Sequence, residues 1–121
     1  MRRIQLIALT RPEDDQKFNK ILLESIDETI SDLLSKKVKD ALYTHLERVR
    51  SVSKDEIPYR LDVLSRTLED TFGAGGSLTI SRAIAKRLYF KLEMAPINVT
   101  PARTLKEYIE NARKNFRRKG G

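Results

Sequence analysis

The chain has 121 residues, the size of one compact domain, and 40% of them are apolar while 34% are charged. This apolar content excludes a disordered chain, and the absence of cysteine excludes disulfides and thiolate metal sites. The formal net charge of +7 is unevenly distributed: residues 1–81 carry 13 Lys and Arg against 14 Asp and Glu, whereas residues 82–121 carry 11 against 3. The basic excess therefore lies in the last third of the chain.

The sequence carries no feature that predicts a membrane span or export. Its longest apolar runs, such as residues 6–9, are far shorter than the roughly 20 residues that a spanning helix needs. The basic start at Arg2 and Arg3 is not followed by the long apolar core of a secretory signal. We therefore expect a cytoplasmic protein. Few Asn and Gln beside many charged residues are typical of a thermostable one.

Apolar side chains recur at spacings of three and four from Lys17 onward, which predicts helices. The first helix ends near Leu33 and starts as early as Arg11, because residues 10–13 match a capping box with proline in the first turn. A second helix follows an N-cap at Ser35. Its expected inward face carries Val38, Ala41, Leu42, His45, Leu46 and Val49.

Three more helices are predicted in the second half. A proline in the first turn begins the third helix at residues 57–58, and Gly73 ends it as a left-handed C-cap, with a tight reversal over residues 74–76. The fourth helix covers residues 77–94. Residues 100–101 then cap a fifth helix, whose apolar stripe consists of Leu105, Tyr108, Ile109, Ala112 and Phe116.

The predicted architecture is all-α, a four-helix bundle core with an additional amphipathic C-terminal helix. We divide the chain into an N-terminal extension (1–19), a four-helix domain (20–94) and a linker with a basic C-terminal helix and frayed tail (95–121). Only residues 4–10 match a strand, which would need a partner chain. One residue from each core helix should lie in a shared core: Ile26, Leu46, Leu68 and Leu88.

Residues 23–94 carry five motifs in a recognisable order. They are Glu24-Ser25-Ile26-Asp27-Glu28, Leu42-Tyr43-Thr44-His45-Leu46-Glu47, Asp55-Glu56-Ile57-Pro58, Leu68-Glu69-Asp70-Thr71-Phe72-Gly73 and Ile84-Ala85-Lys86-Arg87-Leu88-Tyr89. This segment resembles a family of small, mostly archaeal all-helical domains described as an archaeal output domain. The resemblance implies a four-helix signalling or interaction domain. It implies no catalytic residues, because the activity of that family is uncharacterised.

Catalysis finds little support in the residues themselves. His45 is the only histidine, and without a second histidine or a cysteine it cannot complete a zinc site of the usual kind. We expect it at the edge of the core. Residues 72–77 lack the preceding strand and the Gly-Lys-Ser/Thr ending of a phosphate-binding loop. We therefore expect a protein that is not an enzyme and has no cofactor.

One helical face carries a ribbon of carboxylates that consists of Glu24, Asp27, Glu28 and Asp32. Hard cations such as calcium prefer six to eight clustered oxygens, which a straight helix cannot wrap around one ion. We expect a solvated helix face, with weak calcium binding as the least favoured alternative function.

The fourth helix carries a set of candidate docking residues opposite its apolar spine: Phe90, Arg82, Lys86 and Arg87. A large aromatic side chain among cations is unfavourable in water but suits an anchor beneath a covering element. We expect residues 101–116 to fold back over this side of the fourth helix, or to dock onto a second chain and form a homodimer. The leading hypothesis is a non-enzymatic interaction or signalling-output domain with an unknown protein partner.

The alternative is a nucleic-acid-associated protein that uses the basic end of the chain. The phosphate contacts would come from Arg113, Lys114, Arg117, Arg118 and Lys119. The sequence has no recognisable helix-turn-helix signature and no obvious row of aromatic side chains for stacking bases, which weighs against this alternative.

Overall fold

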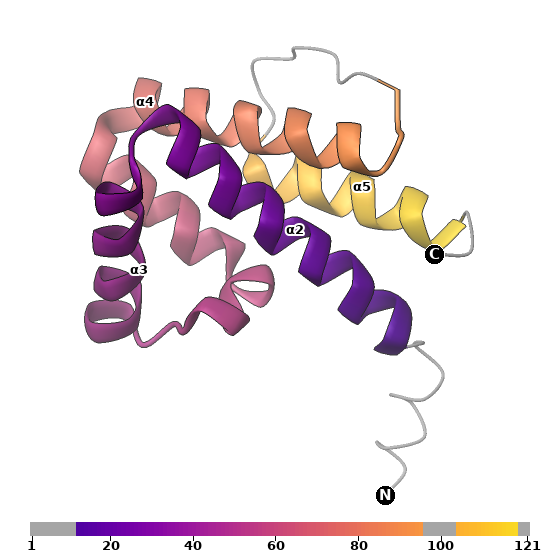
Figure 1. Ribbon diagram of the computed structural model, residues 1–121, viewed down its shortest axis with the longest axis horizontal. Helices are drawn as coiled ribbons and strands as arrows, with labels where there is room; N and C mark the ends of the chain where they lie inside the picture. The colour runs from indigo at the N-terminus through magenta and orange to yellow at the C-terminus, as the bar shows by residue number, and fades with distance from the viewer. Residues whose placement is uncertain (1–11, 96–103, 119–121) are drawn as a thin grey trace, which may run out of the picture.

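A computed structural model describes residues 12–95 and 104–118. These residues form α2 (Pro12–Leu33), α3 (Lys36–Arg50), the short 3-10 helix η1 (Lys54–Tyr59), α4 (Leu61–Lys91) and α5 (Leu105–Arg118), as Figure 1 shows. No strand occurs within these two ranges, so the predicted all-α class is confirmed. The strand predicted at residues 4–10 lies outside the described residues.

The start of α3 and the start of α4 differ in how well the sequence predicted them. The Ser35 hydroxyl accepts a hydrogen bond from the Val38 N–H at 3.1 Å, so the predicted N-cap is confirmed. The helix expected from residues 57–58 instead begins at Leu61. Ser53 and Glu56 form a capping box that starts η1, and Ile57 and Pro58 of this turn are buried.

Helix α4 is broken at Gly73, where φ is 81° and ψ is 170°. The φ of Gly73 is positive, as a left-handed C-cap requires, but its ψ lies outside the left-handed helical region, so that cap is not formed as predicted. The reversal takes one residue rather than four, because Gly75 and Gly76 are already helical. The two predicted helices are therefore a first arm (residues 61–72) and a second arm (residues 74–91) of α4. Figure 1 shows the second arm turning back across the molecule.

The core gathers around α2, which packs against α3, η1, both arms of α4 and α5. Its buried stripe consists of Phe18, Leu22, Ile26 and Ile30. The four residues expected to share a core, Ile26, Leu46, Leu68 and Leu88, are all buried in one apolar cluster, so that prediction is confirmed.

Helix α5 belongs to the same core, which corrects the division into a four-helix domain and a separate tail. Leu105, Ile109 and Ala112 are buried in the cluster that α2, α3 and α4 form. The Tyr89 hydroxyl of α4 donates to the Tyr108 carbonyl at 3.2 Å and accepts from the Asn111 amide at 2.9 Å. The apolar stripe of α5 is therefore used within its own chain and is not available for the homodimer that was considered.

The first turn of α5 is fixed by Thr104. Its backbone N–H donates to Glu107 Oε1 at 2.8 Å, and its hydroxyl accepts from the Glu107 N–H at 3.1 Å, which makes a capping box. The predicted caps at residues 100–101 lie outside the described residues. The helix therefore starts at Leu105, four residues later than the sequence suggested.

The orientation of α3 was also predicted wrongly. Of its expected inward face, only Leu42 and Leu46 are buried, whereas Val38, Ala41, His45 and Val49 are exposed. The reason is that α3 packs on α2 and α4 from one side only and stands at the edge of the molecule in Figure 1. His45 is therefore a surface residue, not a residue at the edge of the core.

Candidate interaction surface

The most exposed large apolar side chain among the described residues is Phe90, which is 82% exposed. It lies on the second arm of α4 beside a shallow hollow of about 520 Å³. We call the residues that line this hollow the Phe90 surface: Ala83, Lys86, Arg87, Phe90 and Lys91 from α4, with Glu28 from α2.

Phe90 is exposed because α2 and α5, the two helices that pack against the second arm of α4, contact other sides of it. Ile84 and Leu88 are buried in the core that α4 shares with α2, and Tyr89 is held by α5 through its hydroxyl. The expectation that residues 101–116 cover Phe90 is therefore wrong for the described part of that segment. Helix α5 does fold back onto α4, but it takes the side that Tyr89 occupies.

Two cations of this surface join α4 to α2. Arg87 Nη1 lies 3.1 Å from Glu28 Oε1, and the same guanidinium also bonds to Asp32. Lys91 Nζ lies 3.2 Å from Glu28 Oε1. Hydrogen bonds from Lys91 and then from Arg87 hold the pKa of Glu28 below its ordinary value.

The structure thus brings together three of the four predicted docking residues. Lys86 is exposed and forms no ion pair within the described ranges, Arg87 is partly occupied by carboxylates, and Phe90 is free. Arg82 does not line the hollow. It is half-buried, and its Nε is sheltered without a hydrogen-bond partner among the described residues. Sequence reasoning missed Ala83 and Lys91, although helical spacing could have found both, because Ala83 lies four residues before Arg87 and Lys91 four residues after it.

The acidic ribbon is solvated at Glu24 and Asp32, as the sequence predicted, but neighbouring elements place cations against it and partly bury Asp27 and Glu28. Asp27 accepts hydrogen bonds from Lys39 Nζ at 3.0 Å and from the Tyr43 hydroxyl at 3.2 Å, and Lys54 Nζ lies 3.4 Å away. Glu24 lies 4.0 Å from Lys91. Within residues 12–95 and 104–118, no group of three or more His, Asp or Glu is arranged to hold a metal ion. The calcium alternative therefore gains no geometric support.

The Asp27 cluster shifts two ionisations. Partial burial alone would raise the pKa of Asp27, but the hydrogen bond from Lys39 and the charges of Lys54 and Lys39 outweigh it and lower the pKa. Burial, followed by the charge of Asp27, raises the pKa of Tyr43. Tyr43 therefore remains a neutral donor to an ionised Asp27 across the ordinary pH range.

Several of the predicted phosphate contacts on α5 have structural roles. The Arg113 guanidinium lies 4.5 Å from the centre of the Phe18 ring and 3.8 Å from Asp15, and burial lowers its pKa. Arg117 lies 2.9 Å from the same carboxylate. Lys114 is exposed, whereas the side chain of Arg118 and all of Lys119 lie outside the described part. Two of the five predicted phosphate contacts, Arg113 and Arg117, therefore already lie against Asp15.

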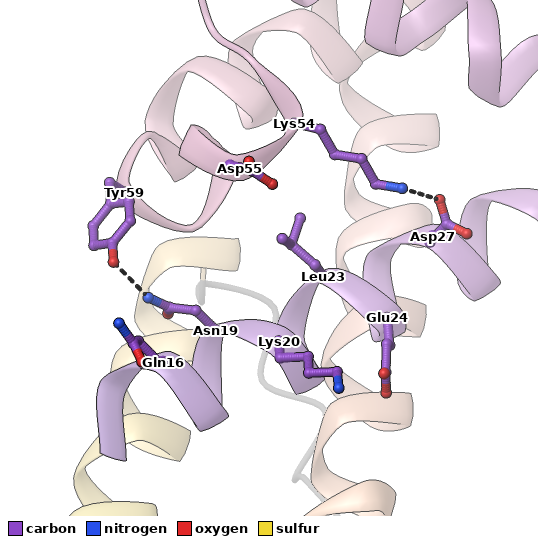
Figure 2. Close-up of a pocket in the computed structure, with 9 residues that line it drawn as sticks. All are labelled: Gln16, Asn19, Lys20, Leu23, Glu24, Asp27, Lys54, Asp55 and Tyr59. Atoms are coloured by element: carbon purple, nitrogen blue, oxygen red, sulfur yellow. Dashed lines mark hydrogen bonds and ion pairs between the residues drawn. The ribbon is translucent and has the colours of Figure 1, made fainter. Parts of the chain in front are cut away.

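A second groove, of about 460 Å³, separates α2 from η1 (Figure 2). Asn19 donates from Nδ2 to the Tyr59 hydroxyl at 2.9 Å on one side, and Lys54 reaches Asp27 on the other. This groove could not be predicted from the sequence, because the 3-10 helix that forms one of its walls was not expected. Its lining mixes Lys20 with Asp55 and other charges of both signs, so it favours no particular ligand class.

Comparison of the chain with protein-family models, with curated proteins and with solved structures gave no match. The resemblance to the archaeal output domain therefore stays a prediction. Across the two described ranges, no helix combines the length and apolar character that crossing a membrane requires.

Proposed function

We propose that the protein is a non-enzymatic helical interaction module that docks another protein through the Phe90 surface. The observation that carries this proposal is the 82% exposure of Phe90 on a helix that buries Ile84, Leu88 and Tyr89 nearby. Removing a phenylalanine side chain from water is favourable by about 1.5–3 kcal/mol. Aromatic side chains are enriched at interfaces for this reason.

The charges around Phe90 favour a partner with an apolar recess and carboxylates at its rim. Lys86 is exposed and unpaired within the described ranges, so a carboxylate of a partner meets no competitor there. Arg87 and Lys91 are fixed by Glu28 and therefore form a rigid border rather than free cations. A rigid border reduces the side-chain entropy that docking costs.

Nucleic-acid binding is the less favoured function. The single carboxylate of Asp15 lies 2.9 Å from Arg117 and 3.8 Å from Arg113, so it offsets part of the positive charge of two predicted phosphate contacts. Catalysis is disfavoured as well, since His45 is exposed and lies on α3, away from both hollows described above.

The test is a comparison of Phe90→Ser with wild type. Because the ring is already exposed, we expect the free energy of unfolding to change by no more than about 0.5 kcal/mol. Proteins that wild type retains from nuclease-treated host extract should be lost by Phe90→Ser. A purified partner should then bind the variant at least about tenfold more weakly by calorimetry, a loss of about 1.4 kcal/mol.

The control is Tyr59→Ser, which removes another exposed aromatic side chain from a different element, η1. This variant should retain the same partners as wild type. Equal retention by Phe90→Ser contradicts the proposal. Loss of every bound component after nuclease treatment favours the nucleic-acid alternative instead.

A further inference from the structure

Helix α3 carries a second apolar surface that is separate from the Phe90 surface. Val38 and Val49 are 39% and 62% exposed, and Ala41 and His45 between them are exposed as well. At about 100° per residue these four side chains fall within an arc of roughly 80°. We call this arc the α3 stripe. It spans three turns of α3. The buried face of the same helix is formed by Leu42 and Leu46.

The inner face of α3 already packs against the rest of the protein, so α3 cannot rotate to bury the stripe. Leu42 and Leu46 are buried in the core, while Lys39 and Tyr43 bind Asp27 of α2. Rotating α3 to bury Val49 would break both polar contacts and expose two leucines. The stripe is therefore left as an unpartnered helix face, which is the form of surface that receives an amphipathic helix.

The charges beside the stripe select its occupant. Lys37 and Arg48 border it about 60–80° from its centre, whereas Asp40 and Glu47 lie on the far side of the helix. Lys37 and Arg48 are exposed, and neither forms an ion pair within the part of the chain that the structure describes. A docked helix with carboxylates about three turns apart would meet one cation at each end.

The same charges argue against occupants from this chain. Two copies of α3 paired antiparallel would bring their Lys37 and Arg48 edges together, and like charges in contact are unfavourable. Residues 1–11 contain three arginines and no Asp or Glu, so their charge also repels the border of the stripe.

We propose that the α3 stripe docks an amphipathic helix of a partner protein whose apolar face is flanked by Asp or Glu. Together with the Phe90 surface this would make the molecule an adaptor with two docking faces. The inference goes beyond the proposed function and does not depend on it, because the stripe and Phe90 lie on different helices.

The test uses the full chain and two synthetic helical peptides of about 18 residues, long enough for five turns. Both carry a leucine stripe, one flanked by glutamates and the other by lysines. In two-dimensional amide NMR, the glutamate peptide should shift the resonances of residues 37–49. The glutamate peptide should bind at least about tenfold more tightly than the lysine peptide. The reason is that Lys37 and Arg48 attract glutamates but repel lysines.

Ala41→Glu is the disruptive variant, because it places a carboxylate in the stripe beside Lys37 and Arg48, at an exposed helical position. It should abolish these shifts. Glu47→Gln, on the opposite side of α3, and Phe90→Ser should both leave them unchanged. The proposal is overturned by an absence of shifts at about 1 mM peptide, by equal affinity for both peptides, by shifts centred on Phe90, or by self-association through α3.

Discussion

Asp27 is the residue that connects the largest number of elements through side-chain contacts near the acidic ribbon. It lies on α2, takes two partners from α3 and takes Lys54 from η1. None of these contacts is a helix-internal pair, so each stabilises the tertiary arrangement rather than α2 itself. The lowered pKa of Asp27 gives this role a measurable consequence.

We expect Asp27→Asn to lower the free energy of unfolding by about 1–2 kcal/mol at neutral pH, as for a hydrogen-bonded charge that is partly solvated. Because the pKa of Asp27 is lower in the folded state, the stabilisation is complete above the ordinary value of about 3.9. It is lost as the pH falls through the folded-state pKa.

Urea denaturation between about pH 7 and pH 2 measures this, and the difference between wild type and Asp27→Asn should shrink toward zero on the acid side. Glu47→Gln serves as the control, because this exposed carboxylate lies outside the cluster. A difference that is constant over the whole range would mean that Asp27 does not act through its charge.

At the residue scale, the sequence predicted which side chains are notable better than it predicted their contacts. The carboxylate ribbon was visible from helical spacing, but its partners Lys54 and Arg87 come from elements 27 and 59 residues away. Phe90 was identified as an unusual residue from the helical wheel alone. The helical wheel could not predict the side of α4 on which α5 packs, because Tyr89 and Phe90 are adjacent and both carry an aromatic ring.

At the scale of elements, the backbone at Gly73 determines the path of α4. Its φ of 81° and ψ of 170° lie in a region that residues with a Cβ rarely enter. A methyl group added there would meet no atom within 4 Å, so the requirement for glycine is conformational and not steric crowding by a neighbour.

We therefore expect Gly73→Ala to destabilise the protein by about 1–3 kcal/mol. Gly75→Ala is the matched control, because Gly75 is helical and an added Cβ there also meets nothing within 4 Å. That variant should be more stable than wild type by about 0.5–1 kcal/mol. Equal effects of the two substitutions in chemical denaturation would show that the two arms do not need this backbone conformation.

The positions of helices were predictable where a local cap decides them, as at Ser35. They were not predictable where two local signals compete. Pro58 fits the first turn of an α-helix, but the Ser53–Glu56 capping box starts a 3-10 turn first and places Pro58 inside it. The rotation of α3 depends on how many neighbours it has, which its own residues do not encode.

At the scale of the whole molecule, α5 is part of the hydrophobic core and not an addition at its surface. Leu105 and Ile109 are almost completely buried, and the Phe116 ring lies 5.5 Å from that of Phe18. From the sequence, the four predicted core helices were expected to pack without this helix, because a resemblance that ends near residue 94 says nothing about what packs beside it. The apolar stripe of α5 was seen correctly, and only its place in the core was missed.

Truncation after Met94 should therefore abolish cooperative folding. Burial of Leu105 and Ile109 alone is favourable by about 1.5–3 kcal/mol each, a large part of the roughly 5–15 kcal/mol that stabilises a domain. Circular dichroism melting should show a broad, non-cooperative transition, and amide NMR should lose dispersion. A control that ends after Arg118 keeps all of α5 and should melt like the full chain. An unchanged melting temperature after removal of α5 would contradict its place in the core.

The most direct test of the proposed docking function is site-specific photo-crosslinking from position 90, with p-benzoylphenylalanine in place of Phe90 and a second probe in place of Tyr59 as reference. Both positions are exposed aromatic sites, one on α4 and the other on η1. The proposal predicts that position 90 captures a defined protein in nuclease-treated host extract and that position 59 does not. Crosslinks that are identical at both positions, or that reach only nucleic acid before nuclease treatment, would contradict it.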